Sequence, residues 1–98
     1  MVKIHGRYCG PNWTAGKKLA AEDAKRSDFD VKPIDVLDNA CRTHDFLIWR
    51  DGPSYASDTR LMRAAAKIAI DSKQPAAIRA KATLIADTFS IVRLTRVR

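Results

Sequence analysis

The chain has 98 residues, of which 46% are apolar and 30% are charged. This composition is ordinary for a globular protein and excludes a wholly disordered chain. No apolar run approaches the roughly 20 residues needed to span a bilayer, and the N-terminus lacks the apolar stretch of a signal peptide. At this length a core is only marginally sufficient, so a covalent cross-link would help. We expect a single domain over residues 1–98.

The net charge of +7 belongs to the C-terminal part of the chain. Residues 1–59 contain nine Lys/Arg and nine Asp/Glu, whereas residues 60–98 contain nine Lys/Arg against Asp71 and Asp87. Such asymmetry suits an anionic partner, which could be a phospholipid surface or nucleic acid. The alternative interpretation is a basic, solvated face that binds nothing.

The N-terminal third is predicted to be loop. Residues 6–32 contain three glycines, Pro11 and a mixed polar run without periodicity, with a short helical turn within Leu19–Arg26.

The first helix is expected over residues 33–50. Pro33 suits the first helical position, and Gly52-Pro53 stops the helix. Four residues recur at spacings of four, three and four and form one stripe: Leu37, Cys41, His44 and Ile48. Asp45 lies one turn beyond Cys41, so His44 and Asp45 are expected on the buried side of the helix.

The second helix is expected over residues 57–72, with Ser57 as its N-cap. Its apolar stripe consists of Leu61, Met62, Ala65, Ile68 and Ala69. One turn before this stripe stands Asp58, which needs a partner if it is buried. Alternatively, Asp58 complements the helix dipole with its carboxylate in water.

The third helix is expected over residues 75–93, as a packing element without chemistry. Its stripe has a regular period of four and three: Ile78, Ala82, Ile85, Phe89 and Val92. Short turns between the three helices predict antiparallel neighbours and an all-α fold.

The adjacent His44 and Asp45 form the candidate site. A histidine on an apolar helix face can simply be a core residue with its hydrogen bonds satisfied. Here, however, Asp45 offers oxygen ligands directly beside His44, whose side chain can take a proton near neutral pH. Cys41 could bond to Cys9 and hold residues 8–12 against the same helical turn. Carbonyl groups of this glycine-containing loop and a carboxylate suit calcium, whereas zinc would require more His or Cys.

Two motifs resemble the calcium-dependent phospholipase A2 superfamily, in its secreted and parvovirus-capsid forms. They are Tyr8-Cys9-Gly10 and the string Pro33-Ile34-Asp35-Val36-Leu37-Asp38-Asn39-Ala40-Cys41-Arg42-Thr43-His44-Asp45. The family has a Tyr-Cys-Gly-x-Gly calcium loop and a Cys-x-x-His-Asp helix, with the loop cysteine bridged to the helix cysteine. The resemblance covers residues 5 to about 65. It implies a small phospholipase A2-like fold with a calcium loop at about 6–16, two antiparallel active-site helices, a packing helix and a Cys9–Cys41 disulfide.

The resemblance also implies roles for individual residues. His44 would be the general base for hydrolysis of the sn-2 ester of glycerophospholipids, oriented by Asp58. Calcium would be bound by both oxygens of Asp45 and by three backbone carbonyls, those of Tyr8, Gly10 and Asn12. The Gly10 N–H would help to stabilise the oxyanion.

The chain departs from the family pattern at two positions. Asn12 stands where the family usually has Gly, but Asn tolerates positive φ better than most residues. Ile48 stands where the family has a Tyr that supports the aspartate, and Tyr55 is a candidate replacement. A membrane contact is expected at Trp13, Lys17 and Lys18, since Trp and Lys favour an anionic lipid interface. Trp13 could instead cover the core.

The leading hypothesis is therefore a calcium-dependent phospholipase A2 that acts at a phospholipid surface. The alternatives are a catalytically weak phospholipase-like membrane-binding module, suggested by Asn12 and Ile48, and a basic helical nucleic-acid binder, which leaves the cysteines and His44-Asp45 unexplained. The first hypothesis implies no nucleic-acid partner. It also implies an extracellular protein released without a signal peptide, or one carried by a virion.

Overall fold

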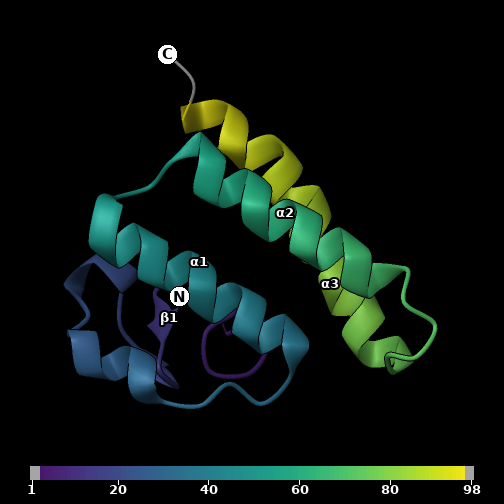
Figure 1. Ribbon diagram of the computed structural model, residues 1–98, viewed down its shortest axis with the longest axis horizontal. Helices are drawn as coiled ribbons and strands as arrows, with labels where there is room; N and C mark the ends of the chain where they lie inside the picture. Colours follow the sequence, from purple (N-terminus) through teal and green to yellow (C-terminus); the bar gives the residue numbers. More distant parts are fainter. Residues whose placement is uncertain (1–2, 97–98) are drawn as a thin grey trace. The chain divides into compact units, whose positions relative to one another are not determined.

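The computed structural model describes residues 3–96, which are mostly α-helical (Figure 1). The chain divides into two compact units, Met1–Gly52 and Pro53–Arg98, which we call the N-terminal and C-terminal units and describe separately. The all-α prediction is confirmed, while the phospholipase-like arrangement and the single domain stay predictions. Arg98, counted in the C-terminal charge, lies outside the described residues. Within those residues, no helix has both the length and the apolar character needed to cross a membrane.

The N-terminal unit is built on helix α1, Val36–Asp51. The helix begins later than predicted, because Asp35 and not Pro33 sets its start. The Asp35 side chain accepts a hydrogen bond from the backbone N–H of Asp38 at 2.8 Å, which is the usual N-cap interaction. The helix ends where Gly52 adopts a φ of 82°.

The segment before α1 is more ordered than the predicted loop. It contains a short hairpin of β1 (Trp13–Thr14) and β2 (Lys17–Lys18), whose two turn residues, Ala15 and Gly16, have φ of 58° and 76°. This is the mirror-image turn that matches the twist of paired strands. Two 3₁₀ helices follow, Ala21–Asp23 and Arg26–Asp30. The first of them lies within the predicted turn at Leu19–Arg26.

An aromatic cluster joins this segment to α1. Phe29 is fully buried, and its ring centroid lies 6.3 Å from that of Tyr8, 5.5 Å from that of Phe46 and 5.9 Å from that of Trp49. Leu37 is also fully buried. The core of the unit therefore lies between α1 and the N-terminal segment that runs along one side of it (Figure 1).

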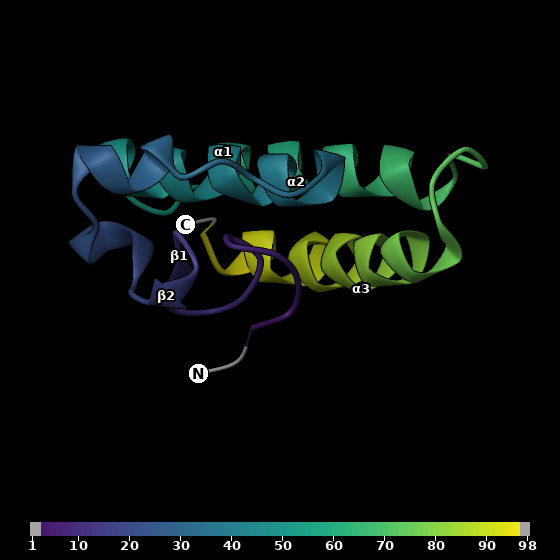
Figure 2. The same ribbon diagram turned by 90° about the horizontal axis from the view of Figure 1, so that it is seen from below.

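The C-terminal unit is a helical hairpin of α2 (Tyr55–Ala69) and α3 (Ala76–Val92), followed by the 3₁₀ helix Arg93–Arg96. The two helices lie side by side and run in opposite directions in both views (Figures 1 and 2). The N-cap of α2 is Ser54, whose Oγ accepts from the N–H of Ser57 at 3.0 Å. The prediction of Ser57 as N-cap was therefore wrong. Ser57 is the third residue of the helix, and its backbone N–H donates to the side chain of the N-cap.

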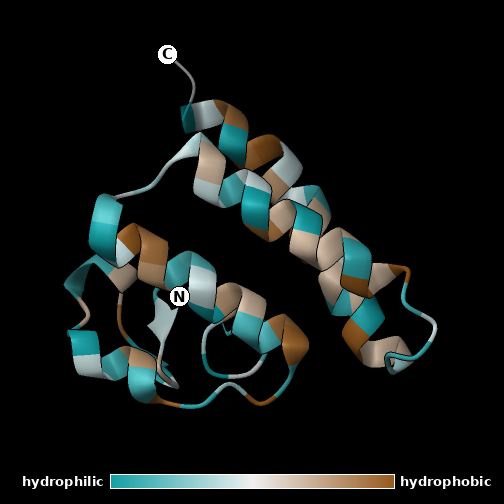
Figure 3. Cartoon of the chain, viewed as in Figure 1, coloured by the Kyte–Doolittle hydropathy of each residue, from teal (hydrophilic) through white to brown (hydrophobic). Residues whose placement is uncertain are grey.

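The predicted stripes of this unit meet in its core. Leu61 and Ala65 of α2 and Ala82 and Ile85 of α3 are buried. Hydropathy varies around each helix as well as along it, as expected for helices with one buried face (Figure 3).

Asp58 is fully buried at the head of the α2 stripe, so the interpretation that places its carboxylate in water is wrong. Its Oδ2 accepts a hydrogen bond from Nε of Arg96 at 3.0 Å. The neighbouring Arg93 stacks its guanidinium 5.1 Å from the ring centroid of Tyr55 and donates to Oγ1 of Thr59. The C-terminal turn is thus attached to the start of α2 by two arginines.

We expect Arg96→Met to lower the free energy of unfolding by about 1–3 kcal/mol, because it removes a charged partner from a buried carboxylate. Arg60→Met is the control, since Arg60 is an exposed arginine of the same unit and its loss should change stability by no more than about 0.5 kcal/mol. Urea denaturation of both variants measures the difference. Equal small losses would show that the Arg96 contact contributes no stability.

Candidate functional site

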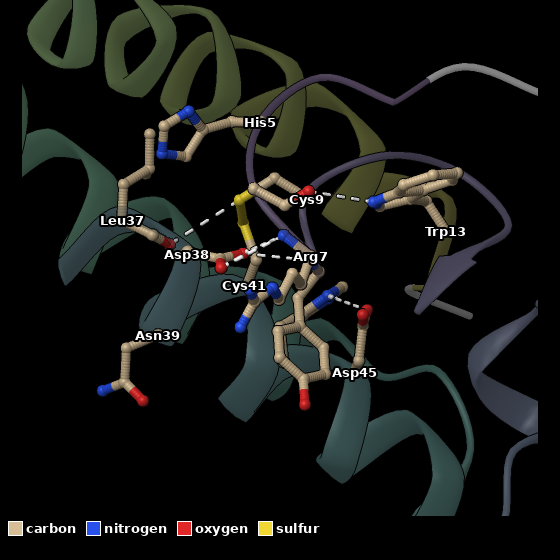
Figure 4. Close-up of a disulfide and its surroundings, with 12 residues drawn as sticks. His5, Arg7, Cys9, Trp13, Leu37, Asp38, Asn39, Cys41 and Asp45 are labelled. Carbon is tan, nitrogen blue, oxygen red and sulfur yellow. Dashed lines mark hydrogen bonds and ion pairs between the residues drawn. A yellow bond between two sulfur atoms is a disulfide. The ribbon is translucent and has the colours of Figure 1, made fainter. Parts of the chain in front are cut away.

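A disulfide between Cys9 and Cys41 joins the N-terminal loop to α1 (Figure 4). Both cysteines are buried, and Cys41 lies three residues before His44 and four before Asp45. The predicted bridge is confirmed. It attaches the loop to the helical turn next to the one that carries the candidate site.

The loop is also held by a buried acid that the sequence analysis did not single out. The carboxylate of Asp38 is fully buried and accepts hydrogen bonds from the backbone N–H groups of Arg7, Tyr8 and Ile34, each at 2.9 Å at its closest. Gly6 lies so close that a Cβ on it would stand 2.4 Å from Cγ of Asp38. The loop therefore wraps around this carboxylate. In the sequence, only the position of Asp38 near the start of the helix pointed to a structural role for it.

Both Gly10 and Asn12 of the loop have positive φ. Gly10 has a φ of 144° and Asn12 has a φ of 53°, so Asn12 occupies the left-handed region that Asn tolerates. The carbonyl of Gly10 accepts from the N–H of Trp13 at 3.3 Å, and that of Asn12 accepts from the N–H of Leu19 at 3.0 Å. Each carbonyl keeps a second lone pair with which it could bind a cation.

The carboxyl group of Asp45 is buried but only partly hydrogen-bonded. Its Oδ2 is buried and has no hydrogen-bond partner among the described residues. Burial raises the pKa of Asp45 to about 9, and the negative charges of Asp38 and Glu22 add to this, while a hydrogen bond with the Thr14 side chain opposes it. A cation in contact with Oδ2 would reverse the preference for the neutral acid, so the residue fits a metal ligand.

Calcium binding by Asp45 stays a prediction. Among residues 3–96, no three His, Cys, Asp or Glu side chains converge to hold a metal ion. Any ion bound here would depend on one carboxylate together with backbone carbonyls, and calcium accepts such all-oxygen ligands.

His44 is buried on the same turn of α1, as the helical stripe predicts. Its Nδ1 lies 4.0 Å from Oδ1 of Asp45, which is an electrostatic contact and not a hydrogen bond. Asp58, predicted to orient His44, belongs to the other unit, so their pairing stays a prediction. Ile48, which stands in place of the family's Tyr, is half-buried.

Two of the three residues expected at a membrane have partners within the N-terminal unit. The indole N–H of Trp13 donates to the carbonyl of Gly6 at 3.0 Å, and Nζ of Lys17 lies 2.9 Å from Oδ1 of Asp28. Lys18 is exposed on β2. A membrane contact at these residues stays a prediction, but Trp13 and Lys17 also hold the loop together.

Comparison of the chain with family models, curated proteins and solved structures finds no match.

We expect Gly6→Ala to destabilise the loop much more than Gly16→Ala. Both glycines have positive φ, so both variants carry a left-handed alanine at a cost of about 1–2 kcal/mol. Only at Gly6 does the new methyl group meet Asp38; at Gly16 its nearest contact is Cγ of Arg7 at 3.6 Å. Overpacking should bring the cost of Gly6→Ala to about 2–4 kcal/mol. Thermal unfolding of the two variants tests this, and equal shifts in Tm would contradict the close packing of Gly6 on Asp38.

The raised pKa of Asp45 predicts a dependence of stability on pH in the presence of a chelator. A carboxyl group with a higher pKa in the folded state than in the unfolded chain binds more protons when folded. Its contribution to stability is therefore complete below about pH 4 and is lost as the pH rises toward 9. Asp45→Asn should remove this loss, because a neutral amide of the same shape does not titrate.

Denaturation curves of the wild type and Asp45→Asn at a series of pH values from about 5 to about 8, inside this window, give the comparison. Calcium should stabilise the wild type at the upper end of this range and leave Asp45→Asn unchanged. Parallel pH profiles would contradict the raised pKa of Asp45, and equal stabilisation of both proteins by calcium would exclude Asp45 as the cation ligand.

Proposed function

We propose that the protein is a calcium-dependent phospholipase A2 that cleaves the sn-2 ester of glycerophospholipids at a membrane surface. The observation that carries the proposal is the buried Oδ2 of Asp45, which has no partner among the described residues. It stands four residues after a cysteine whose disulfide holds the loop to the same helix. The sequence of that loop and that helix supplies the resemblance to the family.

The chain offers four groups that could hold calcium. They are the carboxylate of Asp45 and the carbonyls of Tyr8, Gly10 and Asn12. Bound there, calcium would supply positive charge to the ester carbonyl and to the oxyanion that forms from it. The N–H of Gly10 would donate a hydrogen bond to the same oxyanion.

His44 would act as the general base. It would take a proton from a water molecule as the water oxygen attacks the sn-2 carbonyl carbon. It would then return the proton to the alcohol oxygen as the ester bond breaks, which yields a lysophospholipid and a fatty acid. The burial of His44 and Asp45 supports this proposal, because a dry site strengthens electrostatic interactions with the transition state.

A second candidate is a phospholipase-like membrane-binding module with little turnover. It is favoured by Asn12, which stands where the calcium loop of the resembled family usually has Gly. The absence of a Tyr at Ile48 points the same way. Retention of His44 and Asp45 together favours the enzyme.

Release of fatty acid from vesicles that carry an sn-2-labelled phospholipid tests the proposal. We expect hydrolysis with calcium and none with chelator, and a loss of at least about 100-fold in His44→Gln, since general-base catalysis contributes about that much. Asp45→Asn should lose both calcium dependence and activity.

Ser90→Ala is a control in the C-terminal unit, because the hydroxyl of the half-buried Ser90 donates to the carbonyl of Asp87 within α3 itself. A folded wild type that releases no fatty acid in either condition would leave the binding module as the better account. Activity that survives chelation and Asp45→Asn would reject the calcium mechanism.

A further inference from the structure

The outer face of α2 carries three positively charged side chains in line. Arg60, Arg63 and Lys67, which we call the basic stripe, are spaced three and four residues apart, opposite the buried positions of Leu61 and Ala65. Residues at these spacings are neighbours on a helix surface. All three side chains are exposed, and in the described part of the chain none of them takes part in an ion pair.

The C-terminal unit does not balance this charge. The unit has nine Lys/Arg against three aspartates, a net charge of +6. The only acidic residue of α2, Asp58, is fully buried and is bound by Arg96. Like charges one turn apart destabilise a helix by a small amount per pair, and an external anion against the basic stripe would remove this cost.

The stripe continues into an exposed apolar residue. Ile70, three residues after Lys67, is 81% exposed at the end of α2. Cationic side chains that flank an exposed apolar one are typical of a surface that binds anionic lipid, where the charges attract the headgroups and the apolar group enters the interface. Single-stranded nucleic acid would require aromatic rings for base stacking, and Tyr55 of α2 is already covered by the guanidinium of Arg93.

We propose that the basic stripe and Ile70 dock the protein on an anionic phospholipid bilayer. The contact belongs to the C-terminal unit, whereas the loop residues Trp13, Lys17 and Lys18 belong to the N-terminal unit. It depends on lipid charge and not on hydrolysis, so it goes beyond the proposed function and can be tested without calcium.

The test is co-sedimentation of the full chain with vesicles of ether-linked phosphatidylcholine, with and without ether-linked phosphatidylserine, in the presence of a chelator. These lipids lack the ester and the buffer lacks calcium, so the result is separate from that of the hydrolysis assay. The wild type should bind only the vesicles that contain phosphatidylserine, and less tightly at high salt.

The test variant replaces Arg60, Arg63 and Lys67 by Gln, which is a good helix former. It should lose at least about tenfold in affinity, because each cation near an anionic surface contributes several-fold. The matched control replaces Lys25, Lys32 and Arg50, three exposed cations of the N-terminal unit outside the expected loop contact, by Gln. It has the same net charge and should bind within about twofold of the wild type if position matters.

Ile70→Ser should weaken the part of the binding that survives high salt, and helical circular dichroism verifies that every variant is folded. Equal losses in the two triple variants would show that net charge alone drives binding and would overturn the proposal. A larger loss in the control would place the contact in the N-terminal unit. Binding to single-stranded RNA but not to the anionic vesicles would replace the lipid by nucleic acid.

Discussion

The buried carboxylate of Asp38 is the interaction on which the N-terminal unit depends. A carboxylate in a protein interior requires several donors, and here they come from Arg7 and Tyr8 on one side and Ile34 on the other. Because these donors belong to the backbone, the side chain fixes the path of the loop and not just one contact. That path brings Cys9 to Cys41, and it leaves Gly6 no room for a side chain.

Asp38 and Asp45 lie seven residues apart on the same side of α1 but have opposite surroundings. The backbone of the loop satisfies Asp38, whereas Asp45 keeps a buried oxygen without a donor in the described residues. Asp38 also adds its negative charge to the field at Asp45 and so raises the pKa of that carboxyl group. Asp38 therefore holds the loop in place, and its negative charge also makes the ionised form of Asp45 harder to form without a bound cation. This difference separates a structural carboxylate from a candidate ligand.

Hydrophobic periodicity and short motifs were sufficient to predict the three helices and the disulfide. Members of each predicted helical stripe are buried, and the two cysteine positions were sufficient to propose the bridge. The partners of buried acids could not be predicted in this way. Arg96 lies 38 residues after Asp58, and the donors to Asp38 lie up to 31 residues before it. The first two helices do not start at the predicted positions. Asp35 rather than Pro33 sets the start of the first helix, and Ser54 rather than Ser57 caps the second. All four residues are acceptable near a helix N-terminus, so the sequence alone does not choose between them.

The placement of the two tryptophans has a practical consequence. Trp13 is hydrogen-bonded to the Gly6 carbonyl in the loop, and Trp49 contacts Phe29 in the aromatic cluster, so both lie in the N-terminal unit. The C-terminal unit contains Tyr55 but no tryptophan. Intrinsic tryptophan fluorescence therefore reports on the loop and α1 alone, whereas far-ultraviolet circular dichroism is weighted toward the helical hairpin as well. Transitions that coincide by both probes would mean that the two units unfold as one cooperative structure.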